Sequence, residues 1–377
     1  MSGVRFRLET DPPRILVQTG KSASAVELPA LWLRERCQDP DNLDPHTQQR
    51  LYDPHRLPDH LSLVRIEETG ENRVRLAFSD GYAGEYELRR LADELDLGDG
   101  LPREIPWRAD LPLEAVSVDG RTLDSDEVRL RAVETFLTHG LIIIRNLATD
   151  PECILGVAHR FGYVRETNFG RIFEVYSRPG SNDLAYRPVS LGAHTDNPYR
   201  EPVPGVQLLH CLVNETSGGW STLVDSLSVA EALQEEDPEG LQLLASTPVR
   251  FRFIDANEEL TERRPIVQRD AVGRMTGVHY SPRLDYLPLL DAGTTRRFQR
   301  ARRRLSELFA DPRFELRFPL GAGELMMFNN SRVLHGRTAY DPNEGRRHLQ
   351  GCYIDLDGPR SVYRTLGRRL RPAPRGR

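Results

Sequence analysis

Two histidines and one aspartate have the residue types and the context of a metal site. In LGAHTDNPY, His194 and Asp196 lie two residues apart, so in an extended segment both side chains project from the same side of the backbone. The apolar segment ELMMFNNSRVLHG brings a further histidine, His335, to the end of a predicted strand. Two imidazoles and one carboxylate are the donor set that holds Fe(II) and leaves three coordination positions open. Because an HxD tripeptide is common by chance, the prediction of an iron site needs support from other residues.

An arginine after the second histidine supplies that support. Arg347 stands in GRRHLQG, shortly after His335. A dicarboxylate cosubstrate that chelates iron through a 2-oxo acid end needs a cation at its far end. A guanidinium meets that need because it donates two parallel hydrogen bonds to a carboxylate. Arg347 is therefore the predicted anion-binding residue.

Composition and charge exclude several classes of protein. The 377 residues carry 51 Lys and Arg against 56 Asp and Glu, a formal net charge of −5, and 38% are hydrophobic. This is a globular mixture without a run of about 18 apolar residues for a membrane span or an apolar signal core, so we expect a cytoplasmic protein with no membrane partner. The net negative charge, without a basic stripe outside the arginine-rich last ten residues, argues against nucleic acid as a partner.

Lysine and cysteine are both scarce. Lys21 is the single lysine and lies outside any motif, which excludes P-loop, pyridoxal and Schiff-base chemistry. The four cysteines are scattered without a CxxC pair, so we expect reduced thiols rather than a disulfide framework.

Hydrophobic periodicity divides the chain into two parts. Short alternating segments predict a small β-rich N-terminal domain at residues 1–100, and the Gly- and Pro-rich stretch 97–112 reads as a linker. Residues 110–377 form the predicted second domain, which mixes strands such as the apolar run Leu141–Ile144 with helices. Helices are expected at Ser125–His139, Ser228–Glu236 and Thr294–Ala310.

The order of the motifs resembles a known family. HTD, SGGWSTLVD, FNNSRVLHGR and RRHLQGCY follow one another as in the Fe(II)- and 2-oxoglutarate-dependent oxygenases of the taurine dioxygenase superfamily. PGVQLLHCL and WLRERC are similar to its γ-butyrobetaine and trimethyllysine dioxygenase branch, and the resemblance spans essentially the whole chain. It implies a mainly β fold, in which a double-stranded β-helix (jelly roll) with flanking helices forms the catalytic domain.

The resemblance also implies roles for individual residues. Iron lies on the two histidines and Asp196, with 2-oxoglutarate and O2 as cosubstrates. The distal carboxylate of 2-oxoglutarate lies on Arg347, with the neighbouring Arg346 as an alternative. A hydroxyl from Ser221 or Thr222 contacts the same carboxylate, and the sequence leaves the choice between them open.

An aromatic cage for a trimethylammonium group can be matched as well. A quaternary ammonium cannot donate hydrogen bonds, so ring faces hold it by cation–π attraction. The cage positions of the family correspond to Phe169, Phe173, Tyr186 and Tyr353. The resemblance therefore implies a hydroxylase of a small trimethylammonium compound such as γ-butyrobetaine, with succinate and CO2 as coproducts; the alternative is that the four rings are core residues.

Departures from the family pattern concern the acidic end of the substrate. Asn197 follows the HTD motif, with Tyr199 close behind, and Asp183 stands where an asparagine is expected. HYSPRLDY puts Arg283 near the pocket, unless it forms an ion pair with Asp285 or another neighbour. Because an arginine suits a more highly charged anion, 2-trimethylaminoethylphosphonate is a rival substrate. Trimethyllysine and a non-catalytic betaine-binding role are further alternatives.

The N-terminal domain departs further. Relatives often bind a structural zinc there through three cysteines and one histidine, but only Cys37 matches, with Asp39, Asn42 and Tyr82 at the other positions. Since zinc prefers thiolate and imidazole ligands, we expect no zinc. The resemblance assigns this domain to packing or to the support of a homodimer.

Overall fold

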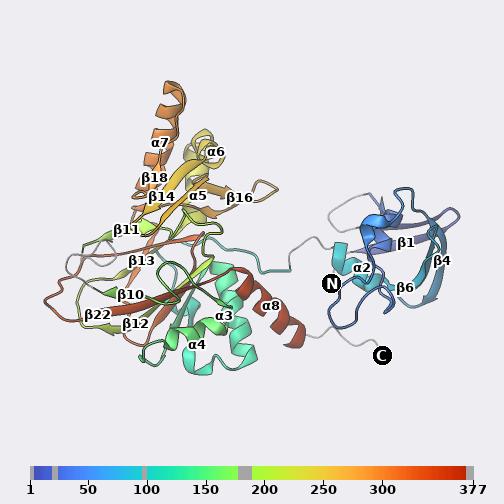
Figure 1. Ribbon diagram of the computed structural model, residues 1–377, viewed down its shortest axis with the longest axis horizontal. Helices are drawn as coiled ribbons and strands as arrows, with labels where there is room; N and C mark the ends of the chain where they lie inside the picture. Colours follow the sequence, from blue (N-terminus) through green and yellow to red (C-terminus); the bar gives the residue numbers. More distant parts are fainter. Residues whose placement is uncertain (1–3, 19–23, 96–99, 177–188, 371–377) are drawn as a thin grey trace. The chain divides into compact units, whose positions relative to one another are not determined.

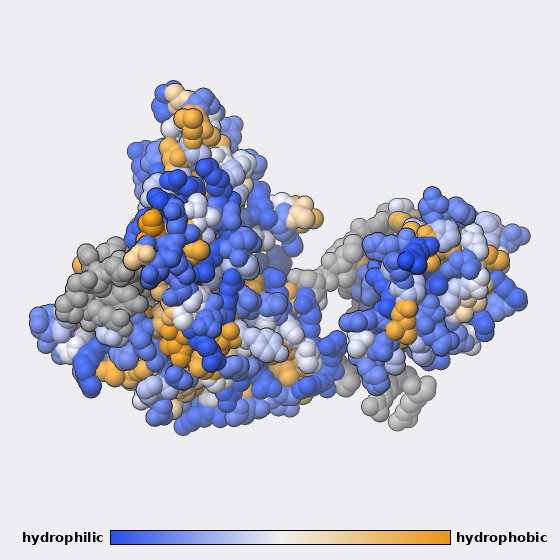
Figure 2. Space-filling model, in the orientation of Figure 1, coloured by the Kyte–Doolittle hydropathy of each residue, from blue (hydrophilic) through white to orange (hydrophobic). Residues whose placement is uncertain are grey.

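The computed structural model describes residues 4–18, 24–95, 100–176 and 189–370. The chain divides into two compact units, Met1–Asp99 and Gly100–Arg377, each with its own hydrophobic core. Among the described residues, no helix is long and apolar enough to cross a membrane. Figure 2 shows a mainly hydrophilic face on which hydrophobic side chains gather in small separate patches.

The N-terminal unit consists of two small antiparallel sheets around one core. Alternate residues of its strands are buried, as the sequence pattern predicts; Val74, Leu76 and Phe78 face the core. The sheets are β1 (Arg5–Thr10), β2 (Pro13–Gln18), β3 (Val26–Glu27) and β4 (Leu63–Gly70), β5 (Arg73–Phe78), β6 (Ala83–Glu87). The helices are α1 (Ala30–Arg34), the 3-10 turn η1 (Pro54–Arg56) and α2 (Leu88–Leu95).

A buried arginine, Arg34, ties together the loops of this unit. Its Nε donates to Asp80 Oδ2 at 2.9 Å, and its guanidinium lies over the rings of Tyr52 and Tyr82, 4.6 and 3.9 Å from their centroids. Tyr82 in turn donates a hydrogen bond to Asp39. Arg34, Asp80, Asp39 and the two tyrosines thus form one network of hydrogen bonds and cation–π contacts.

The four residues at the positions of the family's zinc ligands lie within this arginine-centred network. Asn42 donates to Asp39 Oδ1 at 3.1 Å, and Cys37 Sγ lies 3.8 Å from the Tyr52 hydroxyl. With one thiol and no imidazole, this donor set does not fit the ligand preference of zinc.

Two facing, mostly antiparallel sheets form the frame of the second unit (Figure 1). From β11 to β13, and again from β19 to β22, consecutive strands of this frame alternate between the two sheets, as in a jelly roll. The larger sheet has the order β10-β22-β12-β20-β8-β7, with β9 beside β22, and the smaller one has the order β11-β21-β13-β19. Their bounds are β7 (Ser117–Asp119), β8 (Leu141–Arg145), β9 (Val164–Arg165), β10 (Phe173–Tyr176), β11 (Leu191–His194), β12 (Val206–Asn214), β13 (Ser221–Asp225), β19 (Glu315–Phe318), β20 (Leu325–Asn329), β21 (Val333–Arg337) and β22 (Arg347–Ile354).

Side chains of β8 alternate between two cores. Leu141 and Ile143 pack between the sheets, whereas Ile142 and Ile144 pack against helices on the outer face. Those helices are α3 (Asp126–His139), α4 (Cys153–His159) and α8 (Asp357–Leu370), which lie together beside β12 and β22 in Figure 1. Because β8 is covered on both faces, its sequence is a continuous apolar run rather than an alternating one.

A second group of helices and short strands completes the unit around a separate core. Its helices are α5 (Ser226–Glu236), α6 (Pro238–Ser246) and α7 (Ala292–Phe309), and its strands are β14 (Val249–Ile254), β15 (Glu259–Arg264), β16 (Val267–Arg269), β17 (Met275–Val278) and β18 (Asp285–Tyr286). The 3-10 turns η2 (Leu113–Val116) and η3 (Gly120–Thr122) precede α3.

The predicted fold class, mainly β with flanking helices, is confirmed. The three expected helices correspond to α3, α5 and α7. Helices α6 and α8 are among those that were not predicted from the sequence. Both carry Gly and Pro in their first turn, which weakens the helical signal.

Candidate metal and cosubstrate site

Strand pairing brings the two predicted histidine ligands together. β11 and β21 are antiparallel neighbours in the smaller sheet, and His194 lies directly opposite His335. Both side chains therefore project from the same face, with ring centroids 4.3 Å apart. A register irregularity between Leu191 and His194 is of the kind that re-aims side chains beside active sites.

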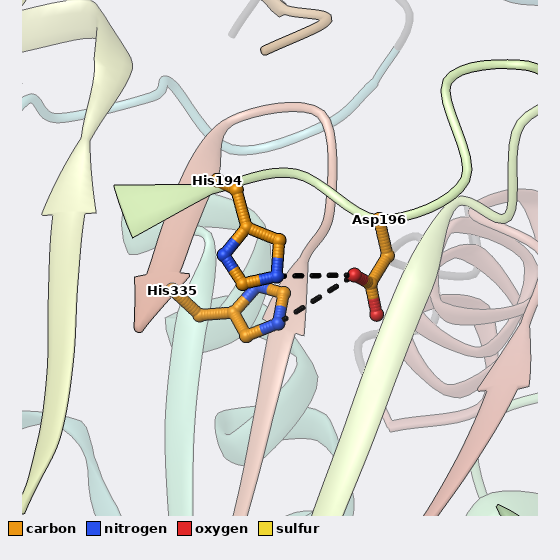
Figure 3. A group of neighbouring side chains, drawn as sticks. All are labelled: His194, Asp196 and His335. Carbon is orange, nitrogen blue, oxygen red and sulfur yellow. Dashed lines mark ion pairs between the residues drawn. The ribbon is translucent and has the colours of Figure 1, made fainter. Parts of the chain in front are cut away.

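Asp196 completes the group from the loop after β11. Its Oδ1 lies 3.4 Å from His194 Nε2 and 3.8 Å from His335 Nε2, and Figure 3 shows this oxygen facing both imidazoles. One ligand atom from each residue falls within 4.8 Å of the others. Imidazole and carboxylate donors in this 2:1 ratio fit Fe(II). Among the described residues, no other group of three such side chains has this property.

Asn330 fixes the loop that carries Asp196. Its Oδ1 accepts a hydrogen bond from the Asp196 backbone N–H at 2.8 Å, and its Nδ2 donates to the Asp196 carbonyl oxygen at 2.9 Å. In the same turn between β20 and β21, fully buried Arg332 forms a two-donor pair with Asp225 at 3.1 and 2.9 Å. The turn that leads into the second histidine is thus held on both sides, which preorganises the ligands.

The electrostatics favour ligands that are ready to bind a cation. Burial, followed by the charge of His194, lowers the pKa of His335 to about 3, so its imidazole is neutral at physiological pH. Burial alone would raise the pKa of Asp196, but its interactions with the two histidines and a hydrogen bond from Tyr353 hold it below its ordinary value. The Nδ1 of His194 lies 3.0 Å from the Gly192 carbonyl oxygen, a contact that leaves Nε2 free for a metal.

Arg347 is buried at the start of β22 with unused hydrogen-bonding capacity. Its Nη2 donates to the Gly219 carbonyl oxygen at 3.1 Å, whereas Nε and Nη1 have no hydrogen-bond partner among the described residues. Burial lowers the pKa of Arg347. Gly219 has a φ of +67°, and a Cβ there would lie 2.7 Å from Arg347 Nε, so this position requires glycine. A buried cation with free donors fits the distal carboxylate of 2-oxoglutarate.

The structure places the two neighbouring arginines differently. Arg346, the alternative to Arg347, is exposed and paired with Glu215, Nη2 to Oε1 at 3.0 Å, because adjacent residues at the start of a strand point in opposite directions. The same alternation separates the two hydroxyl candidates. Ser221 lines the cavity described next, and Thr222 does not, so the geometry favours Ser221.

A cavity of about 480 Å³ is lined by His194, Asp196 and His335 and by most of the other predicted site residues. Phe169, Phe173 and Tyr353 line it, as do Asn197, Tyr199 and Arg283. Phe173 and Tyr353 have ring centroids 5.1 Å apart. Tyr186 and Asp183 lie outside the described residues.

Phe169, Phe173 and Tyr353 form what we call the aromatic wall of the cavity. Gly351 and Tyr353 both lie beside Phe173 in this wall. Gly351 of β22 is its strand partner, and a Cβ on Gly351 would lie 2.2 Å from Phe173 Cζ. The Tyr353 hydroxyl donates to Asp196 Oδ2 at 2.7 Å, and burial raises the pKa of Tyr353 well above its usual value.

Sequence reasoning missed several lining residues. Phe253 stacks on Tyr199 with centroids 5.1 Å apart and meets Phe169 edge-on at 6.1 Å. Tyr286 lines the same cavity. Phe253 lies in β14 and Tyr286 in β18, which belong to one sheet. In the sequence these residues stand in alternating segments that predict strands. That pattern does not reveal that the sheet borders the cavity.

The comparisons with known proteins agree with this geometry. The chain matches the family model described as taurine catabolism dioxygenase TauD, TfdA family over residues 106–353, and the model described as γ-butyrobetaine hydroxylase-like, N-terminal, over residues 14–92. It is 34% identical over 334 residues to a γ-butyrobetaine dioxygenase of Pseudomonas sp. (strain AK-1), with 87% of each chain covered. A mitochondrial trimethyllysine dioxygenase of Gallus gallus is 29% identical over 356 residues, with 89% of this chain and 82% of that protein covered.

A solved structure shares the fold. The non-heme iron oxygenase OrfP, in a complex with Fe and succinate, aligns with a TM-score of 0.50 at 17% identity, over 67% of this chain and 87% of that chain. The family match over residues 106–353 and the 34% identical dioxygenase, rather than this structure, confirm the predicted Fe(II) and 2-oxoglutarate chemistry at the level of the family. The iron donors, the buried arginine and the family match over most of the catalytic unit converge on one conclusion: the chain belongs to the taurine catabolism dioxygenase TauD, TfdA family.

Proposed function

We propose that this chain hydroxylates a small trimethylammonium compound of the γ-butyrobetaine type. The observation that carries the proposal is the presence of Phe169, Phe173 and Tyr353 in the wall of the cavity that also contains the metal ligands. Cation–π attraction to such rings is worth about 2 kcal/mol in a desolvated site. The Pseudomonas relative, named a γ-butyrobetaine dioxygenase, supports the same substrate class.

Each residue has a defined binding task in this proposal. His194, Asp196 and His335 would hold Fe(II), which would supply O2 activation: 2-oxoglutarate loses CO2 and becomes succinate, which takes one oxygen atom of O2, and the other atom enters the substrate C–H bond. Arg347 holds the distal carboxylate of 2-oxoglutarate, with Ser221 beside it. The aromatic wall fixes the ammonium group, so that one methylene of the substrate faces the metal.

The anionic end of the substrate is assigned to Arg283. This residue lines the same cavity as the three metal-site residues. A guanidinium binds a phosphonate as well as a carboxylate, so 2-trimethylaminoethylphosphonate is the second candidate, and trimethyllysine is the third.

The deciding experiment measures succinate formed by anaerobically Fe(II)-loaded protein after addition of O2. γ-Butyrobetaine, 2-trimethylaminoethylphosphonate and trimethyllysine are supplied separately, to the unmodified protein and to Arg283→Gln. Strong stimulation by one compound identifies the substrate, and loss of that stimulation in Arg283→Gln supports the anion assignment. If no trimethylammonium compound stimulates succinate formation, the proposed substrate class is wrong.

Three further features remain proposals. We propose domains at residues 1–100 and 110–377, a homodimer as the active form, and a cytoplasmic location. Limited proteolysis, light scattering after size-exclusion chromatography, and fractionation of the native cells test them in turn. Cleavage outside the linker, a monomeric mass, or recovery with the membrane fraction would contradict the respective proposal.

A further inference from the structure

The two carboxylate oxygens of Asp196 have different surroundings. Oδ1 faces the Nε2 atoms of His194 and His335, at 3.4 and 3.8 Å. Oδ2 accepts a hydrogen bond of 2.7 Å from the Tyr353 hydroxyl. The oxygen that faces the imidazoles and the oxygen held by the tyrosine are thus separate atoms of one carboxylate.

The packing of Tyr353 leaves its hydroxyl little freedom. Tyr353 is buried, and its backbone in β22 is paired with Gln207 of β12 on one side and with Arg165 of β9 on the other. The ring lies against Phe173 on its cavity side. The backbone of Asp196 is fixed independently by the two hydrogen bonds with Asn330. Both ends of the hydrogen bond are therefore anchored by separate parts of the fold.

We propose that Tyr353 is a positioning residue that restricts Asp196 to a single metal-binding oxygen. Carboxylates bind metals through one oxygen or two. A metal held by two histidines and one oxygen keeps three positions open, two for the 2-oxo acid end of 2-oxoglutarate and one for O2. A second oxygen from Asp196 would occupy one of these positions. The hydroxyl of Tyr353 prevents this because it donates a hydrogen bond to that oxygen, Oδ2.

This inference rests on the metal site of the proposed function, and it gives Tyr353 two separable tasks. Its ring face belongs to the ammonium-binding wall, whereas its hydroxyl acts through Asp196. Phenylalanine at this position keeps the ring and removes only the hydroxyl. Tyr199→Phe is the matched control, because Tyr199 lines the same cavity but donates its hydroxyl to Asn197, at 2.7 Å, rather than to a metal ligand.

The test compares unmodified protein, Tyr353→Phe and Tyr199→Phe without O2. Each protein is loaded with Fe(II) to measure its affinity for 2-oxoglutarate by calorimetry, and with Co(II) to record the visible absorption that reports coordination geometry. In Tyr353→Phe we expect a Co(II) spectrum that differs from that of both other proteins. We also expect affinity for 2-oxoglutarate to fall by about 10-fold or more, the usual effect of losing a hydrogen bond to a metal ligand.

Each remaining outcome is informative. Unchanged spectrum and unchanged 2-oxoglutarate affinity in Tyr353→Phe would overturn the inference, as would complete loss of metal binding, because a freed oxygen adds a ligand rather than removing one. If Tyr353→Phe does not fold, Tyr353→Met gives the same test with the ring removed as well, and the same spectral change is expected. Failure of the unmodified protein to bind Fe(II) would instead count against the proposed function.

Discussion

His335 of β21 lies directly opposite His194 of β11, although the two residues are far apart in the sequence. The hydrogen bonding of two neighbouring strands sets this relationship, so the fold itself places the two imidazoles side by side. Substitution of a side chain at this site should therefore affect metal binding more than folding.

Loss of one imidazole is the most direct test of the metal site. We expect His335→Ala to bind no stoichiometric Fe(II) and to lose turnover by more than about 100-fold, since even indirect changes around a metal cost 10–100-fold. Metal analysis of the anaerobically loaded protein checks this. His159→Ala, which removes an exposed histidine of α4, serves as the control, and full iron content in His335→Ala would refute the ligand set.

Two adjacent arginines allow a matched test of cosubstrate binding. We expect Arg347→Met to raise the KM for 2-oxoglutarate by about 10–100-fold, because a hydrogen bond to a charged group is worth about 1.5–3 kcal/mol. Arg346→Met removes an exposed charge paired with Glu215, so the same KM should stay within about 2-fold. Equal effects of the two substitutions, measured by succinate formation, would contradict the assignment.

The aromatic wall should select the charge of the substrate. We expect Phe173→Leu to raise the KM for the trimethylammonium substrate by about 10-fold or more, as the loss of one cation–π contact implies. The KM for 2-oxoglutarate should not change. Competition by an uncharged tert-butyl analogue of the substrate provides the control: if its inhibition constant rises as much as the substrate KM, the ring contributes contact area rather than attraction to a cation.

A buried histidine should make the catalytic unit sensitive to acid. Neither ring nitrogen of His210 has a hydrogen-bond partner among the described residues, and burial lowers its pKa from 6.5 to about 4. Between these two values the unfolded chain binds a proton that the folded chain does not. Stability is therefore complete above pH 6.5 and falls as the pH drops towards 4.

Substitution of His210 tests this dependence. His210→Leu should be more stable at pH 7.5, because it removes an unsatisfied polar group worth about 1 kcal/mol or more. It should also lose less stability between pH 7.5 and pH 5, by roughly 1–2 kcal/mol. Urea unfolding at both pH values measures the two effects, with His159→Leu as the control. An unchanged pH dependence would show that His210 is not the sensitive group.

The arginine-centred network of the N-terminal unit should stabilise it without a metal. We expect Arg34→Met to lower the free energy of unfolding by about 2 kcal/mol, because it leaves Asp80 largely buried and unpaired. Arg36→Met, which removes a more exposed arginine lying over Trp32, is the control. Addition of a chelator should leave the unfolding midpoint unchanged, and a drop would point to a bound metal.

The sequence was sufficient for the metal ligands but not for their surroundings. HxD, the later histidine and Arg347 could be found because each stands in a short motif of distinctive residue types. The choice between Arg346 and Arg347 needed the direction in which each side chain leaves β22, which spacing alone does not supply. The second task of Tyr353 depends on how β22 and the loop after β11 approach each other, a contact between distant segments that no local pattern encodes.

The absence of a side chain at Gly351 lets the ring of Phe173 lie close against β22 in the wall of the cavity. The aromatic ring occupies the space that any side chain on Gly351 would fill. Under the proposed function, the size of the head group that the cavity accepts therefore depends partly on the lack of a Cβ atom at Gly351 of β22. Under the proposed function, substitution of Gly351 would change the selectivity among ammonium compounds while Phe169, Phe173 and Tyr353 stay in place.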